Sequence, residues 1–306
     1  MPFDALRSSY SPAVDVGASP EKPGSNAPIG IFDSGLGGLS VLRAVRATLP
    51  DERLIYAADS LYAPYGERDD DFIADRTLAI CEWLVSQGAK ALVVACNTAT
   101  SQSIAQTRER LAVPVIGVEP GIKPAAITSQ TRVVGVLATA VTLRSARFQA
   151  LAERHTADCR FILQPGHGLV QAVERCDLDS PELLGLLRSY VEPMLDANAD
   201  TLVLGCTHYP FLDEAIRSIA GDRLTLVDTS VAIARQLERQ LDSFGLRAVP
   251  RLDQAQAQAV ELPRFYSTSD GQALRQLAAS LLGLDVAVEH VVIPSRRTVG
   301  PESDPA

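Results

Sequence analysis

The sequence predicts an α/β protein in which one α/β unit is used twice. From Ile29 onward, short apolar runs alternate with longer segments of helical period, which is the pattern of parallel strands joined by crossover helices. Two pairs of segments also resemble each other: IGIFDSG at 29–35 resembles VGVLATA at 134–140, and ALVVACNTAT at 91–100 resembles TLVLGCTHYP at 201–210. The chain has 306 residues, about twice the length of an average domain, so it has room for two such units.

Short runs rich in branched apolar residues mark the predicted strands. These strands are expected at 29–32, 54–58, 91–96, 114–118, 133–138, 160–163, 201–206, 224–227 and 264–268. Segments of helical period fill the gaps, most clearly at 70–86, 180–196, 229–242 and 270–282. The last of these helices is expected to begin at Asp270 and Gly271, because the two residues favour a cap and a turn.

Composition and charge narrow the class of protein. Hydrophobic residues make up 46% and charged residues 21% of the chain, which is the balance of a globular protein and excludes wholesale disorder. The formal net charge is -9, so there is no overall positive field for phosphate backbones or anionic lipids. No apolar run approaches the roughly 18 to 20 residues of a membrane span. Neither a nucleic acid nor a membrane is therefore an expected partner.

The cysteines and the N-terminal segment both favour a location in the cytoplasm. The five cysteines are odd in number and widely spaced, with no C-x-x-C pair, so neither a disulfide framework nor a metal site is expected. Residues 1–28 are rich in Pro and Ser and lack the apolar core of a secretory signal, which predicts a disordered tail. We expect a cytoplasmic protein.

Two cysteines stand at equivalent places in the repeat. Cys96 and Cys206 each end a predicted strand, and ligands of open α/β sheets bind beyond the carboxyl ends of strands. A cysteine at the end of a buried strand is often a small core residue. Here, however, each is followed by polar side chains that a core would have to desolvate, namely Asn97 and Thr98 after the first and Thr207 and His208 after the second. The pattern favours a cleft with one thiol on each wall.

Two further segments supply candidate binding groups. Asp33 and Ser34 lead into the glycine-rich turn DSGLGG, whose backbone N–H groups can approach an anion closely. The third glycine of a dinucleotide fingerprint would fall at Ser40, so an amino-acid or carboxylate site fits this turn better than a nucleotide site. A simple helix cap at Ser34 is the structural alternative. Tyr65 and Gly66 lie in a loop that can extend over a ligand.

The matched pair of thiols indicates one kind of chemistry. A single cysteine with a histidine would suggest acyl transfer, but a second thiol on the opposite wall suits removal of a proton from one face of a carbon and its return to the other face. His208 is close enough in sequence to Cys206 to support a thiolate. Pyridoxal chemistry needs a lysine, and the chain has only Lys22, Lys90 and Lys123, none in a suggestive context. No cofactor is expected.

These motifs resemble those of the glutamate racemases, a family within the cofactor-independent aspartate/glutamate racemase superfamily. The matching stretches are IGIFDSGLGGLSVL, YAPYGER, ALVVACNTAT, VPVIGVEPGIKPA, GVLAT, LVLGCTHYPFL and LVDTS, which run from residue 29 to about 230. The resemblance implies two pseudo-symmetric, Rossmann-like lobes whose parallel sheets flank a central cleft. It also implies interconversion of L- and D-glutamate by two thiols, with the D isomer supplied to peptidoglycan synthesis for the bacterial cell wall.

The resemblance also assigns roles. Cys96 and Cys206 correspond to the two acid/base thiols, with Cys206 taking the proton from L-glutamate and Cys96 from D-glutamate. The family's substrate contacts fall on Asp33, Ser34, Tyr65, Gly66, Asn97, Thr98, Thr207 and His208, and Asp33 and His208 match residues that assist proton transfer. A peptidoglycan precursor that activates some members with N-terminal extensions is a candidate partner, and a homodimer is a candidate assembly.

Some features depart from the family or stay open. Gln164 and Pro165 stand where many relatives have a cysteine-proline pair, so 165–174 aligns loosely and the role of Glu174 is undetermined. The family's chain path places lobe one at 29–119 plus 229–293 and lobe two at 120–228, with a second disordered tail at 294–306. Two alternatives remain: a sister enzyme acting on aspartate, a hydantoin or a related acid, and a bilobed protein that binds a ligand without exchanging its α-proton.

Overall fold

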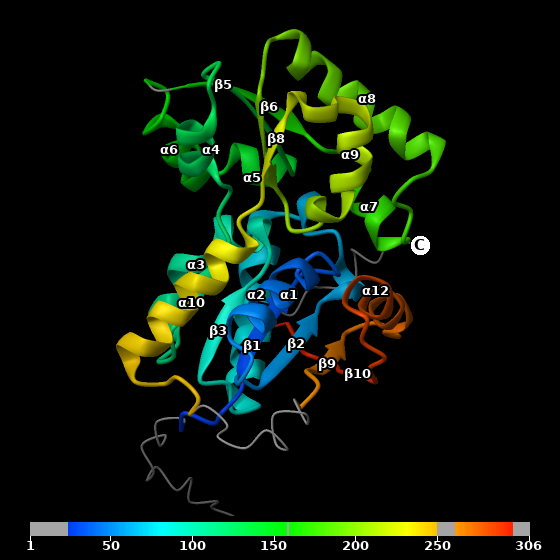
Figure 1. Ribbon diagram of the computed structural model, residues 1–306. Coiled ribbons are helices and arrows are strands. Elements are labelled where there is room, and N and C mark those ends of the chain that lie inside the picture. Colours follow the sequence, from blue (N-terminus) through cyan, green and yellow to red (C-terminus); the bar gives the residue numbers. More distant parts are fainter. Residues whose placement is uncertain (1–23, 158, 250–260, 296–306) are drawn as a thin grey trace, which may run out of the picture.

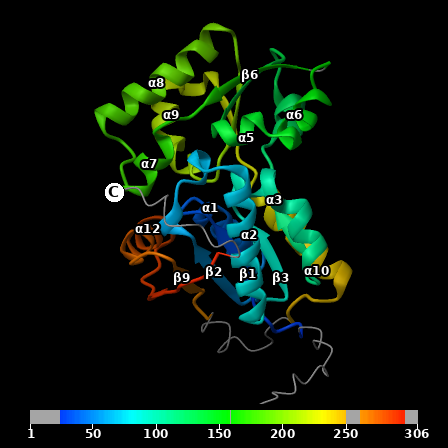
Figure 2. The same ribbon diagram turned by 180° about the vertical axis from the view of Figure 1, so that it is seen from behind.

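A computed structural model describes residues 24–157, 159–249 and 261–295 of the chain. The described residues form two lobes, each built on its own parallel sheet (Figure 1). Lobe one contains the six-stranded sheet and lobe two the four-stranded sheet. Figure 2 shows the same division from behind, with the helices of each lobe packed on both faces of its sheet.

The sheet of lobe one has the strand order β10-β9-β2-β1-β3-β4. Its strands are β1 (Ile29–Asp33), β2 (Leu54–Ala58), β3 (Ala91–Val94), β4 (Val115–Gly117), β9 (Arg264–Ser267) and β10 (Val288–His290). Its helices are α1 (Leu39–Thr48), α2 (Asp70–Ser86), α3 (Asn97–Arg110), α10 (Ser230–Phe244) and α12 (Gln272–Leu282). The apolar side chains of α1, α10 and α12 are buried on one face of this sheet, and those of α2 and α3 on the other.

The sheet of lobe two has the order β6-β5-β7-β8. Its strands are β5 (Val133–Ala138), β6 (Arg160–Pro165), β7 (Thr201–Gly205) and β8 (Thr225–Val227). Its helices are α4 (Ile122–Thr128), α5 (Ala140–Arg144), α6 (Ala146–Glu153), α7 (Leu169–Glu174), α8 (Pro181–Asp196) and α9 (Asp213–Ala220). One face is covered by α7, α8 and α9, and the other by α4, α5 and α6.

The two sheets repeat one topology. The order β2-β1-β3-β4 in lobe one matches β6-β5-β7-β8 in lobe two, strand for strand in chain order. In the first, Phe32 pairs with Val94, and in the second, Leu137 pairs with Leu204. The predicted repeat is therefore present in the register as well as in the strand order, and the expected α/β class with two lobes of parallel sheet is confirmed.

The chain leaves lobe one after β4 and returns to it after β8. The returning helix α10 packs against α1 through buried residues that include Ala234 and Leu237 (Figure 1). Strands β9 and β10 then complete the first sheet. This path agrees with the expected insertion of one lobe into the other, while the residues chosen as lobe limits, 119 to 120 and 228 to 229, stay a prediction.

Several boundaries differ from those predicted. The strands expected to reach Cys96 and Cys206 end at Val94 and Gly205, because the backbone turns there to start the next element. Strand β10 was not predicted, since it is a short, half-polar edge strand without an alternating pattern. Helix α12 begins at Gln272, two residues later than predicted. Its N-cap is Gly271, with φ +75°, and the Asp270 carboxylate just before it accepts a hydrogen bond of 3.0 Å from the Gln272 N–H.

The predicted tails lie mostly outside the described residues. Residues 24–28, expected to be part of the N-terminal tail, are placed against lobe one, where the Lys90 N–H donates to the Pro28 carbonyl at 2.9 Å. The Lys90 ammonium also pairs with Glu52 at 2.5 Å, and both side chains are buried. Within the described part of the chain, every helix is too short or too polar to span a lipid bilayer.

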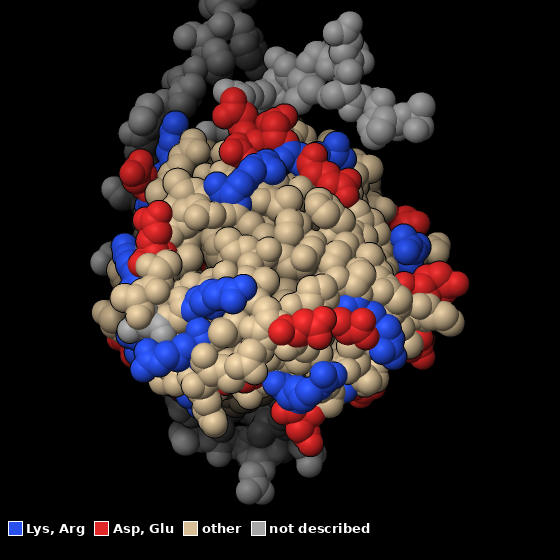
Figure 3. Space-filling view, turned by 90° about the horizontal axis from the view of Figure 1, so that it is seen from above, with Lys and Arg blue, Asp and Glu red and all other residues tan. Residues whose placement is uncertain are grey.

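The outer end of lobe two carries charges of both signs. Figure 3 shows this end from above, with acidic and basic side chains distributed around an uncharged central area. This face has no single-sign patch of the kind that binds phosphate backbones.

Candidate active site

The candidate site lies where the carboxyl ends of the two sheets meet. Because Phe32 is in register with Val94, Ser34 and Cys96 come two residues later on adjoining chain segments. In lobe two, Leu137 is in register with Leu204, which brings Thr139 and Cys206 to the same distance beyond their strands. Parallel pairing thus places one thiol at the equivalent position of each lobe.

Cys96 is buried at the end of the β3 segment in lobe one, where its side chain is the N-cap of α3. Its Sγ lies 3.3 Å from the Ser34 hydroxyl and accepts from the Ala99 N–H at 3.4 Å. Burial raises the pKa of the Cys96 thiol to about 12, and the neighbouring Asp33 adds to that rise, while the two hydrogen bonds oppose it. At neutral pH this sulfur therefore carries its proton.

Asp33 is fully buried at the end of β1. One carboxylate oxygen, Oδ2, accepts hydrogen bonds from the N–H groups of Gly35 at 3.2 Å and Gly38 at 3.0 Å. The other, Oδ1, is buried and has no hydrogen-bond partner among the described residues. Burial raises the pKa of the Asp33 carboxyl, and although the charge of His208 and the two N–H groups oppose this, the net direction is upward. Asp33 is thus a carboxyl group that can hold a proton beside the first thiol.

Cys206 lies in a pocket of different composition. Its Sγ is 3.6 Å from Nδ1 of His208, and Nε2 of the same ring is 2.6 Å from the Glu174 carboxylate. Burial acts to lower the pKa of His208, but the hydrogen bonds and charges of Cys206 and Glu174 outweigh it and raise that pKa well above 6.5. The raised pKa favours the cationic form of the ring, and a cation beside a cysteine is an environment that favours a thiolate.

Glu174 joins the second pocket to the glycine turn of lobe one. Its Oε1 also accepts from the Leu36 N–H at 2.8 Å. The Gly37 N–H is 3.1 Å from His208 Nε2, but a protonated ring nitrogen donates rather than accepts, so the shorter contact to Glu174 decides the role of Nε2. The turn after Asp33 and the histidine beside Cys206 are consequently packed against each other across the cleft.

The remaining candidates on the strand ends are all buried. Asn97 donates from Nδ2 to the Val118 carbonyl at 3.4 Å, and the Thr98 hydroxyl is 2.9 Å from the hydroxyl of Thr139 in lobe two. The Thr207 carbonyl accepts from the Ser40 hydroxyl at 3.0 Å. The structure therefore brings Asp33, Ser34, Cys96, Asn97, Thr98, Cys206, Thr207 and His208 to one inter-lobe region.

Tyr65 differs from the expectation that its ring covers a ligand. The ring is 1% exposed and packs on Phe32, and its hydroxyl donates to Asp59 at 2.5 Å. Asp59 also forms a buried ion pair with Arg76. A ligand contact from this residue would come from its backbone. Gly66, the next residue, lies against Thr139, whose Cβ would be only 3.2 Å from a Cβ at Gly66.

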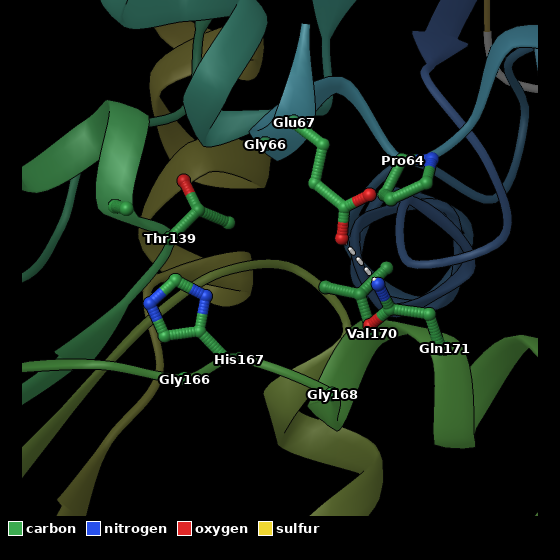
Figure 4. A pocket seen from close by; sticks show the side chains of 10 residues that line it. Pro64, Gly66, Glu67, Thr139, Gly166, His167, Gly168, Val170 and Gln171 are labelled. Carbon is green, nitrogen blue, oxygen red and sulfur yellow. Dashed lines mark hydrogen bonds between the residues drawn. The ribbon is translucent and has the colours of Figure 1, made fainter.

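The mouth of the cleft is narrow. A cavity of about 30 Å³ is lined by Gly66 and Glu67 of lobe one and by Thr139, His167 and Gln171 of lobe two (Figure 4). The Gln171 amide donates to the Glu67 carboxylate at 2.5 Å and so bridges the two rims. Together with the Thr98–Thr139 and Ser40–Thr207 contacts, this bridge shows that the lobes are closed in this structure.

The family model described as Asp/Glu/Hydantoin racemase matches residues 39–237. The chain belongs to this family. A glutamate racemase of Ralstonia pickettii is 61% identical over 259 residues, which cover 85% of this chain and 89% of the relative. This degree of identity confirms the resemblance to the glutamate racemases that the motifs predicted, and the protein is an isomerase, an amino-acid racemase.

Solved structures of racemases share the fold. A glutamate racemase isoform of Bacillus anthracis has a TM-score of 0.78 at 29% identity, covering 89% of this chain and all of the other. The Escherichia coli glutamate racemase in complex with L-glutamate and the activator UDP-MurNAc-Ala has a TM-score of 0.75 at 32% identity, covering 88% of this chain and all of the other. Both matches extend over the two lobes.

The sequence did not predict one residue of this racemase site, Thr139, and left the role of a second, Glu174, open. Thr139 joins Thr98 to Thr142 through hydroxyl contacts of 2.9 Å each. The repeat contains the signal that could have found it, since aligning IGIFDSG with VGVLATA pairs Ser34 with Thr139. Glu174 lies in a loosely alignable segment, and only the fold shows that it contacts His208. Among the described residues, no group of three His, Cys, Asp or Glu side chains is arranged to hold a metal ion.

Proposed function

We propose that this racemase interconverts L- and D-glutamate by a two-base mechanism in which Cys96 and Cys206 face opposite sides of the α-carbon. One observation carries the proposal: two buried thiols occupy equivalent positions in the two lobes, yet have different protonation partners. An imidazolium stands beside Cys206, while burial and Asp33 keep the Cys96 thiol protonated. In the proposed resting site, Cys206 is the base and Cys96 is the acid.

In the forward direction, the Cys206 thiolate removes the α-proton of L-glutamate. The Cys96 thiol then delivers its own proton to the opposite face, which yields D-glutamate, a Cys206 thiol and a Cys96 thiolate. The reverse reaction begins from that second state. The starting state returns when Cys206 releases its proton to solvent and Cys96 takes one from solvent, so no net acid or base is consumed.

The groups around each thiol support its charged form in turn. When Cys96 is a thiolate, the Ser34 hydroxyl and the Ala99 N–H at the start of α3 can donate to it. The Asp33 carboxyl, whose pKa is raised, can hold a proton at that stage and so remove the charge that opposes the thiolate. On the other side, His208 held by Glu174 supports the Cys206 thiolate.

Glutamate itself is the proposed substrate because the relatives over most of the chain are glutamate racemases. The Francisella tularensis relative was solved with D-glutamate and the Escherichia coli relative with L-glutamate. We assign the substrate contacts to Ser34, Asn97, Thr98 and Thr207, to His208, and to the backbone of Tyr65 and Gly66. A closed, dry cleft with fixed donors lowers the energy of the carbanion-like transition state.

The proposal needs no cofactor. Pyridoxal phosphate would require a free lysine in the site, but the Lys90 ammonium is paired with Glu52 at the base of lobe one. We place the reaction in the cytoplasm, where thiols stay reduced, and assign the D-glutamate to peptidoglycan synthesis. Activation by a peptidoglycan precursor is proposed from the Escherichia coli complex, and a homodimer remains a prediction.

The deciding experiment follows the α-proton. The purified protein is incubated with L-glutamate in deuterium oxide without cofactor, with and without UDP-MurNAc-Ala, and both chirality and α-deuterium are measured. We expect D-glutamate that carries deuterium. If L-glutamate is returned unchanged while L-aspartate is racemised, the substrate assignment is wrong, and if neither exchanges its α-proton, the protein only binds its ligand.

A further inference from the structure

We propose that Ser40 is a positioning residue that sets the spacing between the two thiols. The inference rests on the proposed two-thiol mechanism, because only that mechanism requires both sulfurs at fixed distances from one carbon. Ser40 is not among the residues assigned to the substrate or to proton transfer. It is the second residue of α1 in lobe one, and its side chain is completely buried.

The Ser40 hydroxyl lies between one carbonyl of each lobe. Its Oγ is 2.9 Å from the Gly37 carbonyl and 3.0 Å from the Thr207 carbonyl. Gly37 belongs to the turn that follows Asp33, and Thr207 directly follows Cys206. The Gly37 carbonyl also accepts from the Ser40 N–H at 3.0 Å, so the single hydroxyl proton is available to the Thr207 carbonyl. The Ser40 side chain therefore links α1 of lobe one to the backbone beside the second thiol.

A second contact packs the His208 ring against the same turn, at Gly37. A Cβ at Gly37 would lie 2.3 Å from the His208 ring, so the ring rests directly on the Gly37 backbone. With the ring packed on the Gly37 backbone and the Thr207 carbonyl bonded to Ser40, the segment 206–208 is packed against lobe one at both residues. The position of Cys206 relative to Cys96 follows from these two contacts.

A hydroxyl suits this place because its single proton can bond either of two carbonyls, that of Gly37 or that of Thr207. When the lobes separate, the proton can stay on the Gly37 carbonyl, as in an ordinary first turn of a helix, so opening leaves no unsatisfied donor. When the lobes close, the same proton bonds the Thr207 carbonyl, which is buried and would have no hydrogen bond from Ser40 without it. The contact therefore favours one closed geometry without preventing release.

The test separates spacing from folding by using two reactions. Inversion of glutamate needs both thiols, whereas 3-chloroglutamate needs one: a thiolate takes the α-proton, chloride leaves the β-carbon, and the enamine hydrolyses to 2-oxoglutarate and ammonium. The isomer that Cys96 deprotonates is identified as the one still consumed by Cys206→Ser. Ser103→Ala is the matched control, since that buried hydroxyl bonds only within α3, to the Ala99 carbonyl at 2.7 Å.

We expect Ser40→Ala to lower kcat for glutamate on the order of 100-fold, the scale of a misplacement of about 1 Å. The rate of elimination by Cys96 should stay within about threefold of wild type. A shift of Cys206 leaves the surroundings of Cys96 in place, and the remaining loss should be that of one weak contact. Ser103→Ala should leave both reactions unchanged. If Ser40→Ala loses both reactions equally, or neither, the inference is overturned. If wild-type protein does not invert glutamate, the proposed function fails instead.

Discussion

The two thiol pockets have the same backbone and different chemistry. Each thiol follows a strand at the same register position, but Cys96 is surrounded by a hydroxyl, a helix N–H and a buried carboxyl, and Cys206 by a histidine held by a carboxylate. Identical pockets would have equal proton affinities, and neither thiol would be ready as a base. In the proposed mechanism, this difference lets a duplicated unit supply an acid and a base from the same residue type.

The largest expected effect comes from removing either sulfur. Cys96→Ser and Cys206→Ser should each lower racemisation by more than about 1,000-fold, because a serine hydroxyl is far too weak an acid or base for the α-proton. Circular dichroism and glutamate binding should be unchanged, since both substitutions are nearly isosteric. Full activity in either variant contradicts the two-base mechanism, and Cys159→Ser, in the core of lobe two with its Sγ 3.6 Å from the Ala126 carbonyl, serves as the control.

Replacing the side chain beside each thiol should lower activity by different amounts at Cys206 and at Cys96. His208→Asn removes the cation beside Cys206 and should lower kcat/KM about 100-fold, within the range of acid-base assistance. Ser34→Ala removes one weak hydrogen bond from Cys96 and should cost about tenfold or less. The two losses are compared by measuring steady-state rates from L- to D-glutamate and from D- to L-glutamate. Equal losses in the two variants contradict the proposed difference between the pockets.

The Glu174–His208 pair should set the alkaline limit of activity. Glu174 contributes to raising the pKa of His208, so His208 stays cationic above 6.5 and loses its proton only as the pH rises through its raised pKa. Glu174→Gln keeps the hydrogen-bond acceptor but removes the charge, and the alkaline fall of kcat/KM should move to lower pH. The stability that the pair supplies is likewise present at low pH and lost in that alkaline range.

The control for this profile is Glu67→Gln, which makes the same charge change at the cleft mouth, where the carboxylate contacts Gln171 instead of a histidine. Its pH profile should match wild type. An unshifted alkaline limb in Glu174→Gln would show that His208 does not depend on this carboxylate.

The smallest effect is expected at the rim. Gln171→Ala removes an exposed hydrogen bond between the lobes and should change KM by less than about threefold, since water replaces such a contact readily. The buried Ser40 contact has no such replacement. A loss in Gln171→Ala as large as that in Ser40→Ala would contradict the distinction between a rim contact and a spacing contact.

Local sequence signals predicted most of the fold. The helix at 70–86 agrees with α2 at both ends, and the strands at 54–58 and 133–138 agree with β2 and β5, because their apolar runs are bounded by turn residues. Edge strand β10 escaped prediction because an exposed strand has no buried face to mark it. The repeat likewise predicted the equivalent positions of Cys96 and Cys206.

The sequence by itself determined the α/β class, the duplicated unit and the residue types at the strand ends, since period and composition act over short stretches of chain. Only the tertiary structure decided how those ends meet. The contacts of Glu174 with Leu36, of Thr139 with Thr98 and of Ser40 with Thr207 join residues far apart in sequence and in different lobes, and the contact of Glu174 with His208 joins distant residues of lobe two. The tertiary structure also decided the unequal surroundings of the two thiols, because burial and neighbouring charge depend on what packs around a group and not on its position in the chain.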